Sequence, residues 1–420
     1  MSRSRRTAWL AGGVAALGLF SFAEASGQEV TPPDSAAADS LAPGAAADSL
    51  TLEELEAKLM GELGAVDSTA AAPGGEPATP RTPATLLPDI SVIADLLTDL
   101  SPDGSTIEEG DRFQLREIEL GLQGSVDPYF RYDAFLAFHG EALEIEEGYA
   151  TTLALPAGLQ VKAGKFLLPF GKVNLTHRPE LHTIDYPLYI QAYFGEEGLS
   201  STGVRASWIG APLGIFQELS LAATNGAEPH AREEGEEEPE EDERAGEAKD
   251  LFDDLADRLW VAHLKNSFDL TPASNLEVGA SWGTSATDDP ERARTTLWGL
   301  DAIWRWKPLA LARYRSVILQ AEAAWREQPG PAEERFGAFV FGQVQLTPRV
   351  HLGGRYDVLE PPDPEAGTVH AGQAVLRYFP TEFSQLRLAY ERQAPEGEDA
   401  IDRLLFQLTF ALGPHRPHAY

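Results

Sequence analysis

The sequence predicts an all-β protein: a transmembrane antiparallel β-barrel of about sixteen strands. Three observations support this prediction. Apolar and polar residues alternate along many long segments, short and long connections alternate between these segments, and tryptophans gather at the segment ends. A disordered N-terminal periplasmic linker containing one short helix is expected before the barrel.

The alternation has a period of two, which is the side-chain period of a β-strand. The segments run about ten residues or more, the length that a tilted transmembrane strand needs. In the segment 143–155 the predicted apolar face holds Leu143, Ile145, Tyr149 and Thr151. The predicted strands span 88–98, 113–126, 128–140, 143–155, 158–168, 201–210, 216–226, 258–270, 274–285, 294–307, 312–327, 335–347, 350–359, 368–379, 384–393 and 402–413.

The connections alternate in length. Tight turns occur at 126–128, 156–158, 211–213, 270–272, 307–309, 347–349 and 379–381. Those between them are mostly longer and more acidic, at 99–112, 169–200, 227–257, 286–293, 328–334, 360–367 and 394–401. Outer-membrane barrels have short periplasmic turns and longer external loops. An even strand number then places both chain ends in the periplasm.

The tryptophans predict two aromatic girdles. Trp260, Trp282, Trp298 and Trp325 are expected near the outer rim, on the apolar face of their strands. Trp208, Trp304 and Trp306 are expected near the periplasmic rim. Amphipathic indole rings prefer the headgroup level of a bilayer, so this sorting favours a membrane barrel over a soluble one.

The N-terminus predicts export. Arg3, Arg5 and Arg6 precede the apolar segment 9–22, and the small residues of 23–25 form a cleavage site. This order is that of a secretory signal peptide, which we assign to residues 1–25.

Residues 26–87 form a low-complexity linker whose composition cannot bury a core. Within it, 51–63 is predicted to be a short helix, since Thr51 and Glu54 match a capping box. Two interpretations stay open: a docking or coiled-coil helix that helps to assemble subunits, or a frayed helix in a tether. The barrel itself is assigned to residues 88–420.

The composition excludes several classes of protein. The formal net charge of -33 argues against a nucleic-acid partner, because such binding needs clustered Lys and Arg. The absence of cysteine excludes disulfide scaffolds, thiolate metal sites and thiol nucleophiles. We expect no cofactor.

Charged residues on the polar strand faces are the candidates for lining an aqueous lumen. Rings of one charge select the opposite ion, whereas cross-strand ion pairs simply stiffen the wall, and both interpretations stay open. The inward acidic and basic candidates balance in number, so lumen charge alone predicts no selectivity. The pore-lining candidates are Arg131, Asp133, Glu144, Glu146, Lys162, Lys265, Asp301, Arg305, Arg355 and Arg377.

Two of the long connections stand out. The connection 169–200 is rich in aromatic residues, so we expect it to fold into the lumen and narrow the pore. Its constriction candidates are Tyr189, Tyr193, Phe194, Glu196 and Glu197. Within the connection 227–257, residues 228–254 include fourteen acidic residues against Arg232, Arg244 and Lys249. It is either a solvated, self-repelling loop or an electrostatic collar that concentrates cations.

No metal site is predicted with an established motif. The weak candidates are His177, Glu180, His182 and Asp185, since imidazole and carboxylate groups suit zinc. Their spacing matches no known zinc pattern, and Pro179 prevents a helix that would align them.

Five segments of the chain carry a family resemblance: PDISVIADLL (88–97), QLREIELGLQGSVDPYFRYDAFL (114–136), LPAGLQVKAGKFLLPFGKVNLTH (155–177), YFGEEGLSSTGV (193–204) and LLFQLTFALGPHRPHAY (404–420). Through these segments the chain from about residue 88 onward resembles bacterial outer-membrane proteins related to phosphate-selective porins, some of which are named zinc-regulated TonB-dependent outer-membrane receptors. The resemblance implies a sixteen-stranded, often trimeric pore with a constricting loop. It also implies a C-terminal signal, ending at Tyr420, for the barrel-assembly machinery.

The expected function is that of a porin-like channel in the cell outer membrane for passive diffusion of small hydrophilic solutes or ions. The alternatives are a TonB-linked receptor for a metal or metal complex, which needs a plug and a periplasmic coupling segment, and a non-conducting structural barrel. An enzyme is not expected, because none of the nine histidines lies in a GxSxG or HExxH motif. Expected partners are outer-membrane lipid, the barrel-assembly machinery, transported solutes or ions and, in a homotrimer, further copies of the chain.

Overall fold

The computed structural model describes residues 88–107, 110–139, 142–212, 214–226, 258–286, 294–328, 334–363 and 365–413. The predicted signal peptide (1–25), linker (26–87) and short helix (51–63) lie outside these residues. The acidic connection 227–257 and the C-terminal Tyr420 lie outside them as well.

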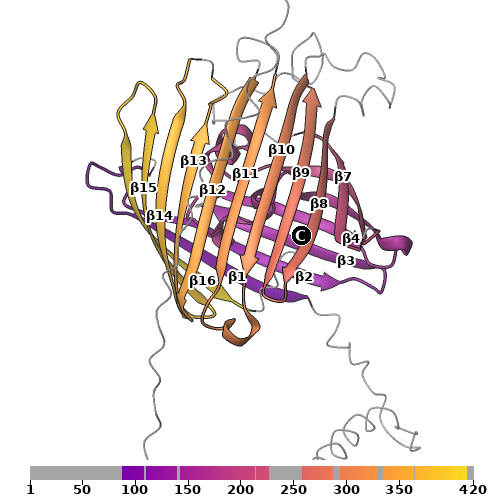
Figure 1. Cartoon of the computed structure of the whole chain (residues 1–420). Helices are drawn as coiled ribbons and strands as arrows, with labels where there is room; N and C mark the ends of the chain where they lie inside the picture. The colour runs from indigo at the N-terminus through magenta and orange to yellow at the C-terminus, as the bar shows by residue number, and fades with distance from the viewer. Residues whose placement is uncertain are drawn as a thin grey trace, which may run out of the picture. The chain divides into compact units, whose positions relative to one another are not determined.

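The described chain forms one closed antiparallel barrel in which each strand pairs with its neighbours in sequence (Figure 1). The predicted fold class is confirmed. The strands are β1 (Asp89–Asp99), β2 (Phe113–Ser125), β3 (Phe130–His139), β4 (Ala142–Thr152), β5 (Leu159–Leu167), β6 (Ser200–Gly210), β7 (Phe216–Thr224), β8 (Leu259–Thr271), β9 (Ser274–Ala286), β10 (Arg294–Trp306), β11 (Val317–Glu327), β12 (Glu334–Thr347), β13 (Val350–Leu359), β14 (Val369–Thr381), β15 (Ser384–Pro395) and β16 (Ile401–Leu412).

The first and last strands close the ring. Val92 of β1 pairs with Leu412 of β16 at one end of the seam, and Asp99 pairs with Leu405 at the other. Between them the buried carboxylate of Asp95 accepts hydrogen bonds from Gln407 Nε2 at 2.6 Å and Thr409 Oγ1 at 3.0 Å. A closed ring leaves no strand edge with unpaired backbone groups, which is the condition for a β-structure in lipid.

Helical turns occur only in connections of the described chain. They are η3 (Pro156–Gly158), η4 (Val173–Leu175), η5 (Arg178–Glu180), α2 (Leu188–Phe194) and η7 (Leu309–Leu311). The turn η7 follows Pro308 and delays the next strand, so β11 begins at Val317 and not at residue 312 as the alternation predicts. No helix among the described residues is long and apolar enough to cross a membrane.

The outer face is apolar and carries an aromatic band. On β10, Trp298 and Leu300 are 49% and 55% exposed, whereas the alternating Asp301 is 7% exposed. The register places Trp298 directly between Trp282 of β9 and Trp325 of β11. Trp325 in turn faces Phe336 of β12. These neighbouring rings lie at one level, as a girdle at one membrane interface requires.

An arginine at Leu300 is expected to destabilise the barrel by about 2–4 kcal/mol, because this outward position lies between the tryptophans at the two ends of β10 and so near the bilayer midplane. Thr296→Arg is the matched control. It lies on the same face of β10 beyond Trp298, so its expected cost is at most about 1 kcal/mol. Urea unfolding in phospholipid vesicles measures both, and equal costs would contradict this placement of the membrane.

Two β-bulges change which residues point inward. On β2 the register shifts between Leu115 and Glu117, so the consecutive residues Arg116 and Glu117 are both buried, at 8% and 1% exposure. On β4 it shifts between Ile145 and Glu147. A bulge inserts one extra residue into a strand and redirects the side chains around it.

The bulge in β4 changes which residues of this strand face outward, so part of the prediction for this strand is wrong. Leu143 and Ile145 are exposed on the outer face, as predicted. Beyond the bulge the faces exchange, so Tyr149 and Thr151 are buried at 4% and 8% exposure, facing the interior. The predicted outward position of these two residues is wrong, because a strict period of two does not survive an inserted residue.

Candidate functional site

The connection between β5 and β6 folds into the barrel and forms an apolar core there. Phe170, Ile184, Tyr186, Tyr189 and Ile190 are at most 2% exposed. They pack in one buried cluster with inward side chains of the wall. Since an ordinary wide pore keeps its lumen polar, this internal core marks where the barrel is narrowed. We refer to residues 168–199 as the internal loop.

Asn174 fixes the base of the internal loop. Its Nδ2 donates to the carbonyls of Leu168 at 2.8 Å and Leu199 at 3.0 Å, and its Oδ1 accepts from the Leu199 amide at 2.7 Å. The two ends of the loop are therefore held together by one buried side chain, next to the last pair of β5 with β6.

Glu322 of β11 anchors the internal loop at Lys172, Val173 and Tyr189. Its Oε1 accepts from the amides of Lys172 at 3.1 Å and Val173 at 2.8 Å, and its Oε2 accepts from the Tyr189 hydroxyl at 2.7 Å. Gly171, with a φ of 66°, passes so close that a Cβ would lie 2.4 Å from Glu322 Oε2. A side chain at this position would displace the anchoring carboxylate, and the left-handed backbone also favours glycine.

Arginines of the wall anchor the internal loop over residues 179–185. Arg387 of β15 donates to the carbonyls of Pro179, Leu181 and Thr183, and is itself 1% exposed. Arg355 of β13 donates to Thr183 Oγ1 at 2.8 Å and the Asp185 carbonyl at 2.7 Å. Buried carbonyls in an irregular segment need such donors, and here the wall supplies them.

His182 lies in this basic surrounding. Arg377 Nη1 contacts its Nδ1 at 2.6 Å, and its ring stacks on Phe341 with centroids 5.4 Å apart. Burial, together with the charges of Arg377 and Arg387, lowers the pKa of His182 to about 3. The imidazole is therefore neutral at physiological pH, and Nδ1 accepts a hydrogen bond from the guanidinium.

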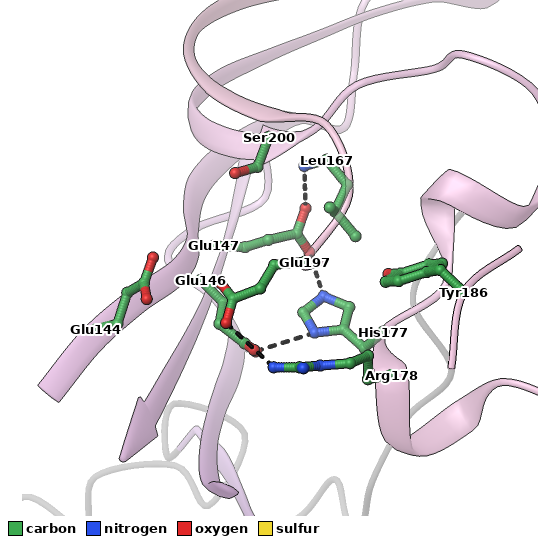
Figure 2. Close-up of a pocket in the computed structure, with 9 residues that line it drawn as sticks. All are labelled: Glu144, Glu146, Glu147, Leu167, His177, Arg178, Tyr186, Glu197 and Ser200. Carbon is green, nitrogen blue, oxygen red and sulfur yellow. Dashed lines mark hydrogen bonds and ion pairs between the residues drawn. The ribbon is translucent and has the colours of Figure 1, made fainter. Parts of the chain in front are cut away.

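His177 lies in the opposite electrostatic surrounding, among glutamates of β2 and β4. Its Nδ1 is 3.1 Å from Glu146 Oε2 and 3.3 Å from Glu119 Oε2, and its Nε2 is 3.0 Å from Glu147 Oε2. Figure 2 shows the ring held between Glu146 and Glu147. Burial by itself lowers the pKa of His177, but the hydrogen bonds to the three glutamates raise it well above its ordinary value.

More charged groups surround this cluster. Arg178 Nη2 is 3.1 Å from Glu197 Oε1 and 3.8 Å from Glu117 Oε2. His139 Nε2 of β3 is 3.6 Å from Glu197 Oε1. The space enclosed here amounts to about 20 Å³, whereas a second cavity of about 110 Å³ lies on the basic side, near His182 and Arg305.

The structure places all the predicted pore-lining residues on the inner face, most of them in ion pairs or ring contacts. Arg131 pairs with Asp133 at 2.6 Å, Lys265 with Glu218 at 2.6 Å, and Arg305 with Glu277 at 2.5 Å. The remaining contacts join Glu144 to Lys165, Lys162 to the Tyr149 ring, Asp301 to His263, Arg355 to Asp357, Glu146 to His177 and Arg377 to His182.

The constriction candidates belong to the internal loop, but their side chains differ in burial and in the contacts that they make. Tyr189 and Phe194 are buried in the internal core. The Tyr193 hydroxyl donates to the Glu360 carbonyl at 3.1 Å, and Glu197 pairs with Arg178. Glu196 is exposed.

The weak metal candidates do not come together. His177 lies in the glutamate cluster, whereas His182 and Asp185 lie among arginines, with Asp185 Oδ1 3.1 Å from Arg116 Nη2. Glu180 lines the cavity on the basic side. The turn η5, which contains Pro179, separates the two surroundings.

The alternation of the sequence places two residues of the site, Arg116 and Glu147, on the wrong face of their strands. Arg116 donates to the Ile184 carbonyl at 3.2 Å, and Glu147 accepts from the Leu167 amide at 2.7 Å. Each belongs to one of the bulges, so strict alternation assigns it to the outer face. A charged residue at an outward position within a lipid-facing strand was the signal that a bulge was present.

No family model matches the chain. A protein of Aquifex aeolicus (strain VF5), called uncharacterized, is 29% identical over 348 residues, which cover 75% of this chain and 71% of that protein. Among solved structures, the outer membrane channel DcaP of Acinetobacter baumannii matches with a TM-score of 0.50 and 12% identity, over 77% of this chain and 96% of that one. The chain has the fold of outer-membrane channels.

The trimer form of OmpT, an outer membrane protein of Vibrio cholerae, also matches with a TM-score of 0.50, at 8% identity, over 78% of this chain and 100% of that one. At these identities the likeness shows the fold alone.

Proposed function

We propose that the protein is an outer-membrane channel for passive diffusion of small hydrophilic solutes or ions, with the internal loop as its constriction. The observation that supports this most directly is a strip of charged residues facing the interior on β8–β10 and the loop. Inside the barrel the side chains of this strip remain partly exposed: Lys265 is 12% exposed, Glu277 18%, Lys172 21% and Arg305 36%. Water therefore reaches one side of the interior beside the apolar core.

The resemblance to phosphate-selective porins and the trimer form of OmpT both support a homotrimer. We therefore expect three channels per particle, each with its own internal loop. The charges of the strip are of both signs and mutually paired, so we propose weak rather than strict ion selectivity.

Conductance of the refolded full chain in a planar bilayer tests the proposal. We expect small, discrete current steps whose size rises with KCl concentration, and a reversal potential close to zero across a KCl gradient. Protein that has lost its heat-modifiable mobility in electrophoresis is the control and should give no steps. A folded barrel without conductance would contradict the proposal and favour the receptor or the structural barrel.

A further inference from the structure

The glutamate cluster around His177 has the composition of a metal site. We propose that Glu119, Glu146 and His177 bind one divalent first-row transition-metal ion inside the barrel. One ligand atom from each residue lies within 4.8 Å of the others. The separations of 3.1 Å and 3.3 Å between His177 Nδ1 and the two carboxylates are close to the roughly 3.3 Å expected between ligands about 2.0–2.1 Å from a tetrahedral ion.

The second ring nitrogen of His177 supports this assignment. Metal-binding histidines donate their other N–H to a carboxylate, which fixes the tautomer and the ring orientation. Here Nε2 is 3.0 Å from Glu147 Oε2, and the other oxygen of Glu147 is held by the Leu167 amide at 2.7 Å. Glu147 is thus a positioning residue, and Nδ1 is presented to the ion.

An independent observation also points to a cation at this place. Glu117 is 1% exposed, and neither of its carboxylate oxygens has a hydrogen-bond partner among the described residues. Its ion-pair partner Arg178 is 3.8 Å away. A Glu117 oxygen lies within 4.8 Å of ligand atoms of His139 and Glu146, so Glu117 is next to the proposed site and shares Glu146 with it. Burying a carboxylate that has no hydrogen bond and only a distant ion-pair partner costs desolvation free energy. A divalent ion nearby would offset that cost.

The chemistry of the donors selects the class of ion. Imidazole together with carboxylate suits zinc, cobalt, nickel or ferrous iron, whereas calcium and magnesium prefer oxygen ligands alone. The space of about 20 Å³ that Glu146 and His177 line is enough for one water-sized occupant. The ion binds His177 Nδ1 without a proton, so any proton on this atom is released to solvent as the ion binds.

Zinc titration of the EDTA-treated, detergent-solubilised full chain by calorimetry tests the proposal. We expect one tight site per chain, weakened at least about 100-fold by Glu146→Gln or His177→Gln. Glu147→Gln should weaken it by about 10–100-fold, the effect of losing a carboxylate behind a metal-bound histidine. Because binding is measured without a bilayer, the outcome is independent of whether the barrel conducts.

Glu218→Gln is the matched control, since it removes a partly buried inner carboxylate paired with Lys265, outside the cluster. It should leave the tight site unchanged, while weak binding to the acidic connection 227–257 is common to all variants. Cobalt provides a second readout, with visible bands expected in the parent and absent in His177→Gln. Equal zinc affinity in the parent and in folded His177→Gln, or no cobalt bands in the parent, would overturn the proposal.

Discussion

Replacing residues 172–197 by a short glycine-serine linker is expected to raise the single-channel conductance several-fold. The replaced segment carries Tyr186, Tyr189 and Ile190, which fill the interior. Leu167 and Ser200 are paired neighbours on β5 and β6, so a short linker spans the gap without disturbing the wall. A barrel of sixteen strands emptied in this way has room for an aqueous channel.

A deletion of similar length within the acidic connection 227–257 is the control for general effects of shortening a loop. We expect it to change the conductance less than twofold at high salt, where charges at a channel mouth are screened. Both variants should keep the heat-modifiable mobility of a folded barrel. An unchanged conductance after removal of 172–197 would show that the internal loop does not limit the current.

The Arg387→Ala substitution is expected to release the internal loop from the wall. It removes donors to the carbonyls of Pro179, Leu181 and Thr183 and leaves these buried oxygens unsatisfied. Hydrogen bonds from a charged group contribute about 1.5–3 kcal/mol each, so the loop should lose on the order of 3 kcal/mol. Loop amides should then exchange about 100-fold faster, since about 1.4 kcal/mol corresponds to a factor of ten.

Hydrogen exchange read by mass spectrometry measures this on peptides covering 176–190. Peptides of β15 itself should keep their protection, because the substitution leaves the strand ladder intact. Arg392→Ala is the matched control on the same strand, since Arg392 is 57% exposed and pairs with Asp402 at the surface. Surface pairs contribute little, so it should leave loop exchange unchanged. Equal exchange in Arg387→Ala and the parent would contradict an anchoring role.

The strands were predictable because two solvents face the wall. Lipid outside and a polar interior enforce a period of two, and residues such as Leu300 and Asp301 follow it without exception along β10. The seam of β1 with β16 was predictable in kind, since a membrane sheet must close. The start of β11 was not predictable. Apolar and polar residues already alternate directly after the turn η7, so the sequence does not mark where the turn ends and the strand begins.

The site was only partly predictable, for two physical reasons. Bulges at Arg116–Glu117 and Glu146–Glu147 add an inward charge to each strand, and a bulge leaves no trace in a strict alternation beyond one misplaced charged residue. The surroundings of His177 and His182 depend on contacts with distant strands. The sequence spacing of the two histidines therefore carries no information about which one meets glutamates and which one meets arginines.

The internal loop also has a consequence for the order of folding. Arg387 and Pro179 are 208 residues apart in sequence, and Asp357 and Leu188 are 169 apart. The loop is made early in the chain, but its anchoring partners on β13 and β15 arrive near the end. Ring closure must bring distant segments together against a high entropic cost. The apolar loop therefore stays without its final contacts until the last strands join, and apolar surface exposed in this interval favours aggregation.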